Sequence, residues 1–219
     1  LKEGIIHAVE ALANEAIYYR KKLLSEDFDE TDDHFEAQVK DDCLSIVYRL
    51  LFIFYAESRA DLDILPISDS VNQKGYSLEM LRDLEQTPLQ TDHAANGYFF
   101  HESLHQLFQL MGNGYRESES QSTVLRNGEK VSDLKSKSFR IRHIDSPLFD
   151  DAKLHQLKGV KFRNIVWQDV ICQLSLSRKQ KGKNRGRISY ANLGINQLGS
   201  VYESLLAFRG FYAEQDYIE

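Results

Sequence analysis

Residues 35–59, FEAQVKDDCLSIVYRLLFIFYAESR, carry the most hydrophobic helical pattern of the sequence. The apolar side chains recur at three- and four-residue steps and cover more than one face of the helix that this spacing predicts. A helix that is apolar on several sides belongs in the middle of a bundle, where its neighbours cover it. We therefore expect this stretch to form the central helix of a mainly α-helical protein. The residues that define its apolar surface are Val39, Cys43, Ile46, Val47, Leu50, Leu51, Ile53, Phe54 and Tyr55.

Shorter amphipathic patterns lie on both sides of this stretch and predict the helices that surround it. Ser77 is a typical N-cap for one of them, and Gly112 and Gly114 are typical stop signals for another. The acidic residues 26–33 predict a solvated connector and helix cap, because a calcium loop would need a glycine and fixed ligand spacing. The predicted surrounding helices are residues 5–24, 76–86, 92–111, 164–176 and 192–208.

Two segments lack a helical period. Residues 112–138 are polar, with a hairpin-type turn signal at Asn127-Gly128, and residues 178–187 are interrupted by glycine and asparagine. We expect both segments to be mobile loops. The predicted fold class is mainly α: a multi-helix bundle with long irregular loops and at most a small β-hairpin, forming one helical connector or scaffold domain over residues 1–219.

The composition and the cysteines limit the class of protein. With 219 residues, 42% hydrophobic and 27% charged, the chain is ordered and long enough to bury a substantial core. Cys43 and Cys172 lie far apart with no CxxC spacing, which favours a reducing bacterial cytoplasm over a disulfide framework. The longest apolar run is far shorter than the roughly 20 residues of a membrane span, so we expect no membrane partner. Because the chain opens at Leu1 without Met and stops at Glu219 just beyond a helical pattern, we expect a piece of a larger chain.

The sequence HESLH, which begins at His101, has the H-E-x-x-H spacing of zinc hydrolases. Two imidazoles one helical turn apart, those of His101 and His105, can bind one zinc ion while Glu102 activates a metal-bound water. A third ligand is still needed, and Glu117 and Glu119 follow two glycines in a polar stretch instead of lying on a second helix. We therefore favour a helix with these polar residues on its wetter side, and keep a zinc-dependent hydrolase as an alternative. The predicted apolar stripe of this helix is Phe99, Phe100, Leu104, Leu107, Phe108 and Met111.

The segment SRKQKGKNRGR, residues 177–187, concentrates positive charge and contains no acid. The whole chain has a formal net charge of −6, so any contact with DNA must come from a local patch. A flexible basic loop would neutralise phosphates without reading sequence, which gives salt-dependent affinity. A solvated loop with no ligand is the other interpretation. The candidate DNA-binding residues are Arg178, Lys179, Lys181, Lys183, Arg185 and Arg187.

Two further stretches carry a family resemblance. Residues 187–211 read RISYANLGINQLGSVYESLLAFRGF and residues 48–66 read YRLLFIFYAESRADLDILP. From its apolar spacing alone, the stretch 187–211 predicts a packing helix that follows a tight turn. Together, in this order, the two stretches resemble the helical region upstream of the methyltransferase core in single-chain (type IIG-like) restriction-modification enzymes and BREX-type adenine-N6 DNA methyltransferases. The two matching stretches and the sequence between them cover most of residues 42–211.

This resemblance implies a parent enzyme of phage defence that methylates adenine in DNA with S-adenosylmethionine and that, in restriction-modification members, also cleaves DNA. The cofactor-binding glycine motif and the Asn-Pro-Pro-Tyr type catalytic motif of such enzymes are both missing from this sequence. No catalytic residue is carried over, and no cofactor is expected on this chain. The expectation is a non-catalytic region that packs on the methyltransferase core of the same parent chain and helps to position double-stranded DNA.

Three charged residues within residues 48–66 lie beside the apolar surface of the central helix. If Arg49, Glu57 and Arg59 are buried, they should be paired or cap helix ends, because an unpaired buried charge is costly. We interpret them as architectural. A protein-binding helical adaptor, which would bind a partner domain but neither zinc nor DNA, is the remaining alternative.

Overall fold

The computed structural model of the protein describes residues 1–29, 32–116, 140–144, 146–177 and 185–193, and the single positions 196, 199, 200 and 203. Over these residues the protein is mainly helical, as the sequence predicts, and each of the two paired strands described has two residues. No helix in these ranges is long and apolar enough to cross a membrane. The helices are α1 (Lys2–Tyr18), α2 (Asp33–Ser58), α3 (Ser70–Gly75), α4 (Leu78–Asp83), α5 (Asp92–Asn96), α6 (Phe99–Asn113) and α7 (Asn164–Ser175), and the strands are β1 (Tyr115–Arg116) and β2 (Arg140–Ile141).

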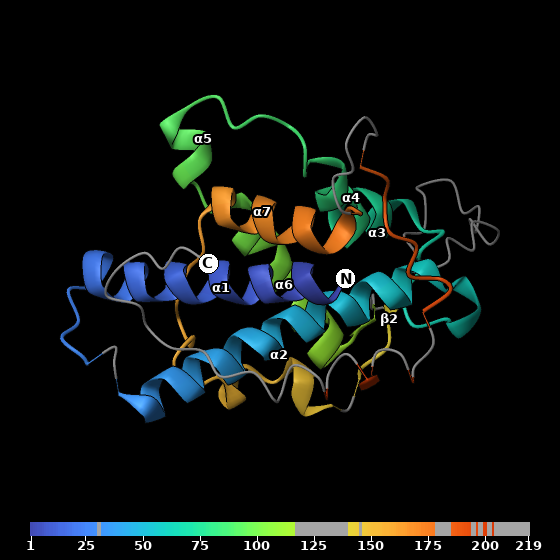
Figure 1. The fold of residues 1–219 in the computed structure, drawn as a ribbon. Helices are drawn as coiled ribbons and strands as arrows, with labels where there is room; N and C mark the ends of the chain where they lie inside the picture. The colour runs from blue at the N-terminus through green and yellow to red at the C-terminus, as the bar shows by residue number, and fades with distance from the viewer. Residues whose placement is uncertain are drawn as a thin grey trace, which may run out of the picture.

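Helix α2 is the core element that its sequence predicts. Its side chains are buried on several faces, and it contacts α1 and α4. The Asp32 carboxylate caps its first turn by accepting from the N–H groups of His34 and Phe35. Figure 1 shows α1 lying between α7 and α2, and both neighbours contact it. The acidic connector therefore ends in a cap, as expected.

The helix predicted over residues 92–111 is wrong as a single element, because the chain breaks between α5 and α6. The two helix ends at the break are stabilised by Asn164, which lies 64 residues from Phe100 in the sequence. Its Oδ1 accepts the Phe100 N–H at 3.0 Å, its Nδ2 donates to Ala94 O at 2.8 Å, and its backbone N–H donates to Gly97 O at 2.8 Å. One buried asparagine thus satisfies open backbone groups at the end of α5 and the start of α6.

Other element bounds differ less from those predicted. Helix α1 continues as a π-helical turn over Tyr19–Leu23, and α6 runs through Gly112 to end before Gly114, whose φ of 71° suits glycine. Ser77 caps α4 through the Met80 N–H, as predicted. The short helix α3 was not predicted.

The predicted loops fall partly outside the described residues. The turn at Asn127-Gly128 lies outside them, while β1 and β2, which flank residues 117–139, pair antiparallel. Of residues 178–187, positions 178–184 lie outside. Of the helix predicted over 192–208, only positions 196, 199, 200 and 203 are described, and all four are helical. Cys43 and Cys172 are both free.

Candidate functional site

The base of the basic segment is fixed to the C-terminal end of α7. The Ser177 N–H donates to Gly186 O at 2.7 Å, and the Ile188 N–H donates to Ser175 O at 2.7 Å. Between them Leu176 and Arg187 form an antiparallel β-bridge. The chain therefore leaves α7 and returns to it at the same place on the scaffold.

A buried tyrosine secures the returning strand of this base. Tyr190 is 2% exposed, its hydroxyl donates to Leu174 O at 2.7 Å, and its ring stacks on Phe54 of α2 at 4.9 Å between centroids. Arg82 of α4, also buried, donates to Ile188 O at 2.9 Å and to Ser175 Oγ at 2.5 Å. These contacts tie the base of the segment to two further helices.

Two of the six predicted DNA-binding cations are described, and both have partners within the protein. Arg185 donates through Nε to Ser177 O at 2.7 Å. Arg187 pairs with Asp83 at 2.7 Å and with Glu79 at 2.8 Å, which lie at the end and the start of the short helix α4. Their guanidinium groups therefore anchor the base of the segment.

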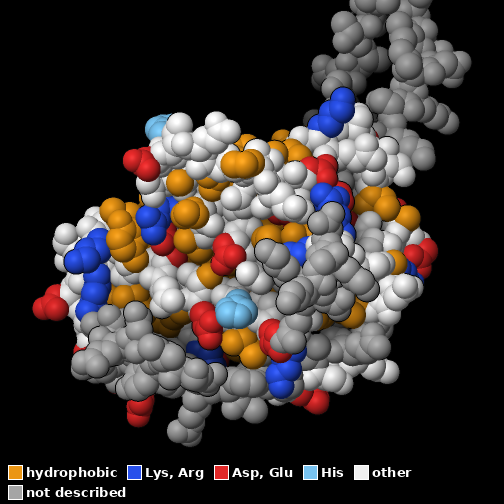
Figure 2. Space-filling view, turned by 45° about the horizontal axis from the view of Figure 1, so that its top comes forward, with side chains coloured by type: hydrophobic (Ala, Val, Ile, Leu, Met, Phe, Trp, Pro, Cys, Tyr) orange, Lys and Arg blue, Asp and Glu red, His pale blue; other side chains and the backbone are white. Residues whose placement is uncertain are grey.

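The other four predicted cations lie outside the described residues. They are Arg178, Lys179, Lys181 and Lys183. On the face of the molecule in Figure 2, the described Lys and Arg side chains are interspersed with Asp and Glu and form no broad basic surface. This agrees with the formal net charge of −6.

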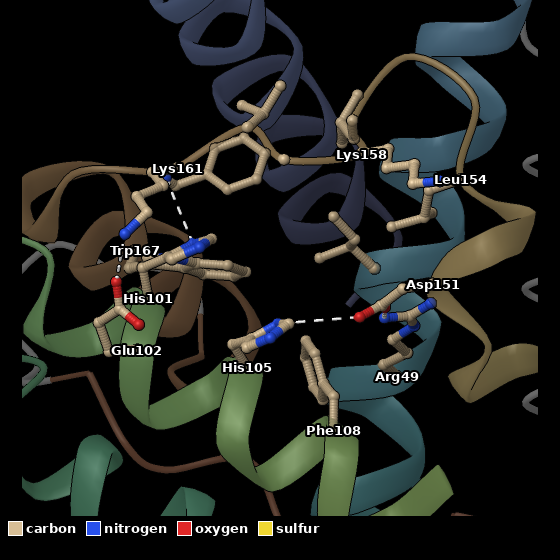
Figure 3. Close-up of a pocket in the computed structure, with 15 residues that line it drawn as sticks. Arg49, His101, Glu102, His105, Phe108, Asp151, Leu154, Lys158, Lys161 and Trp167 are labelled. Carbon is tan, nitrogen blue, oxygen red and sulfur yellow. Dashed lines mark hydrogen bonds and ion pairs between the residues drawn. The ribbon is translucent and has the colours of Figure 1, made fainter.

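The histidines of the HESLH motif lie on α6 beside a pocket of about 490 Å³ (Figure 3). The rings of His101 and His105 are nearly parallel, with centroids 6.2 Å apart. Burial lowers the pKa of His101 to about 4, so this ring is neutral at pH 7. Its Nδ1 accepts the Phe162 N–H at 3.4 Å, which places the ring proton on Nε2.

The zinc alternative requires a third ligand close to the two histidines. Glu102 is paired with Lys161 at 2.7 Å, and Asp151 Oδ2 lies 3.8 Å from His105 Nδ1. Within the described ranges, no group of three or more His, Cys, Asp or Glu side chains is arranged to hold a metal ion. Glu117 and Glu119 lie outside those ranges. The geometry therefore gives the zinc alternative no support.

The other face of α6 is core, as the competing interpretation expects. Phe100 is 3% exposed, Leu104 is 0% exposed and Met111 is 0% exposed. Phe99 is the exception in the predicted apolar stripe, because half of its side chain is exposed. His105 is also half exposed, which agrees with its place on the wetter side.

The three charged residues beside the apolar surface of α2 are paired or cap a helix, as expected. Glu57 accepts the Leu78 N–H at 2.6 Å and the Glu79 N–H at 3.0 Å, and so caps α4. Burial raises the pKa of Glu57 to about 7, against the lowering effect of these two hydrogen bonds. Arg49 is 2% exposed and pairs with Asp151 at 2.5 Å, and Arg59 pairs with Asp61.

Sequence reasoning missed the segment that forms the far side of the pocket. Residues 154–163 have no helix or strand, and Asp42 of α2 holds part of them: its Oδ2 accepts the N–H groups of His155, Gln156 and Leu157 at 2.8, 2.6 and 3.0 Å. The available signal was Asp42 next to Cys43 in the apolar pattern of the helix, because a carboxylate that is buried needs donors.

The comparisons with known proteins return no match: no family model, no curated protein and no solved structure is similar to this chain.

Proposed function

We propose that the protein is the non-catalytic helical region of an adenine-N6 DNA methyltransferase or restriction-modification enzyme. In this proposal it packs on the methyltransferase core of the parent chain and helps to position double-stranded DNA. The resemblance of residues 48–66 and 187–211 supports the class of parent. The basic segment supports the role in DNA positioning.

The observation that carries the proposal is the fixed base of the basic segment. Phosphate contacts fix the orientation of a protein on DNA, and a defined attachment of the contacting cations favours that role. The backbone bonds between Ser177 and Gly186, and between Ser175 and Ile188, give the segment such an attachment. Because Arg185 and Arg187 serve that attachment, the phosphate contacts are assigned to the four remaining cations, Arg178, Lys179, Lys181 and Lys183.

The cofactor of the implied reaction does not fit the described part of this chain. A Rossmann-type site needs a strand that leads through glycines into a helix. The described paired strands, Tyr115–Arg116 and Arg140–Ile141, are two residues each, and they pair with one another. We therefore assign S-adenosylmethionine to the core of the parent enzyme and derive no catalytic step for this chain.

The test is the affinity of the protein for a fluorescently labelled DNA duplex at low salt, measured by anisotropy. Changing Arg178, Lys179, Lys181 and Lys183 to Gln should weaken binding by about tenfold or more. A matched variant changes four cations elsewhere, Lys22, Lys40, Lys74 and Lys153, to Gln. It carries the same net charge and should bind within about threefold of the unchanged protein.

Each outcome separates the proposal from an alternative. Equal weakening in both variants would assign the affinity to net charge and would overturn the role of the segment. No DNA binding by the unchanged protein would also overturn it and would favour a helical adaptor. The adaptor should instead bind a separately produced partner domain with an affinity that the four substitutions leave unchanged.

A further inference from the structure

The pocket beside HESLH has a mainly apolar interior. It lies where α2, α6 and α7 meet the irregular segment 154–162, and Ile46, Phe108, Leu157, Phe162 and Trp167 contribute to its lining. Phe162 and Trp167 meet edge to face, with centroids 5.4 Å apart. The volume of about 490 Å³ lies in the range of small-molecule sites, which combine an apolar interior with a few polar groups.

The walls of this pocket are held in place by charged groups from α2. Asp42 fixes the backbone of residues 155–157 through three hydrogen bonds. Arg49 fixes the preceding turn, because its Nε donates to Leu148 O at 2.7 Å and its Nη1 to Asp151 at 2.5 Å. Gln109 of α6 donates to the other oxygen of Asp151 at 2.7 Å. The pocket is therefore preformed, which lowers the entropic cost of binding.

Among the described charged residues that line the pocket, one cation has no ion-pair partner. Asp151 is paired with Arg49, and Glu102 is paired with Lys161. Lys158, on the irregular segment, also lines the pocket; it is an exposed residue, and it forms no ion pair with any described residue.

A further donor belongs to the walls. His101 is neutral and carries its ring proton on Nε2. The indole nitrogen of Trp167 is fully buried and does not face the open pocket, so Trp167 contributes only its ring to the wall. A hydrogen-bond donor and an unpaired cation beside an apolar interior are the complement of an anion with an apolar body.

We infer that this pocket binds a small organic monoanion with an apolar ring, such as an aryl-alkyl carboxylate. The ring occupies the space against Phe108, Phe162 and Trp167, and the carboxylate lies toward Lys158 (Figure 3). This site is independent of the basic segment, and it needs no DNA.

Trp167 reports directly on occupancy, because it is the only tryptophan of the protein and it lines the pocket. The probe is phenylbutyrate, whose ring does not absorb at the red edge of tryptophan excitation, and the matched neutral compound is phenylbutyramide. Phenylbutyrate should change the Trp167 emission with a dissociation constant of about 0.1–1 mM. The amide should bind about five- to tenfold more weakly.

Two lysine variants separate the pocket from the general surface. Lys158→Gln should weaken phenylbutyrate about fivefold and leave the amide unchanged. Lys153→Gln removes an exposed cation of the turn just before this segment that does not line the pocket, and it should change neither affinity. Equal affinities for acid and amide in the unchanged protein, or equal effects of the two substitutions, would overturn the assignment of an anion. No response of Trp167 to either compound would overturn the site itself.

Discussion

Replacing Asp42 by alanine should destabilise the whole bundle, because one buried carboxylate secures an irregular segment. Asp42 is 2% exposed and accepts three backbone N–H groups on a single oxygen. Each hydrogen bond to a charged group contributes about 1.5–3 kcal/mol, but three bonds that share one atom are not additive. Water can also reach the donor of the exposed His155. We therefore expect the free energy of unfolding to fall by about 3–5 kcal/mol.

Urea unfolding, followed by Trp167 fluorescence and by far-UV circular dichroism, measures this loss. Asp42→Asn should cost less, about 1–2 kcal/mol, because its carbonyl oxygen still accepts. The matched control is Asp41→Ala, which removes a neighbouring carboxylate that is 62% exposed and should change stability by less than about 0.5 kcal/mol. If Asp42→Ala falls within about 1 kcal/mol of this control, the carboxylate does not hold the segment and the reasoning is refuted.

Three further predictions concern other parts of the structure, and each has a change in the free energy of unfolding as a readout. Acidification from pH 7 to pH 4 should lower the free energy of unfolding by about 2–3 kcal/mol through His101, because burial lowers the pKa of this residue to about 4. Below about pH 6.5, the unfolded chain binds a proton at His101 that the folded protein does not bind. His101→Gln should remove that part of the pH dependence, while His105→Gln should retain it; equal slopes in the two variants would contradict the assignment. Asn164→Ala should cost about 2–3 kcal/mol and speed amide hydrogen exchange in the first turn of α6, because it removes the amide that joins α5 to α6; unchanged exchange there would count against it. Glu57→Ala should cost about 1–2 kcal/mol by uncapping α4, and a stability equal to that of the unchanged protein would show that the cap is dispensable.

The sequence predicts the elements that depend on local patterns. The central helix follows from its long apolar period, and the start of α4 follows from the Ser77 cap. The break between α5 and α6 falls at Asn96-Gly97, a local helix-breaking signal that the prediction of a single helix passed over. The group that stabilises the two helix ends there, Asn164, comes from a distant part of the chain and could not be predicted from the local pattern.

In the candidate sites, too, local patterns could be predicted and tertiary contacts could not. Charge patterning locates the basic segment, yet it cannot show that Arg185 and Arg187 turn back to α7 and α4. HESLH marks the pocket, but for zinc chemistry that the described side chains around it do not support. The pocket itself depends on a segment without regular structure, held by Asp42 and Arg49, and such a segment leaves no periodic signal in the sequence.

The most direct test of DNA positioning by the basic segment is the slope of log affinity for duplex DNA against log salt concentration. Each phosphate contact contributes about 0.9 to that slope. Replacing Arg178, Lys179, Lys181 and Lys183 by Gln should therefore make it shallower by about 2–4, while the variant with four Gln substitutions elsewhere should keep the slope of the unchanged protein. A slope that is the same in all three proteins would contradict the account.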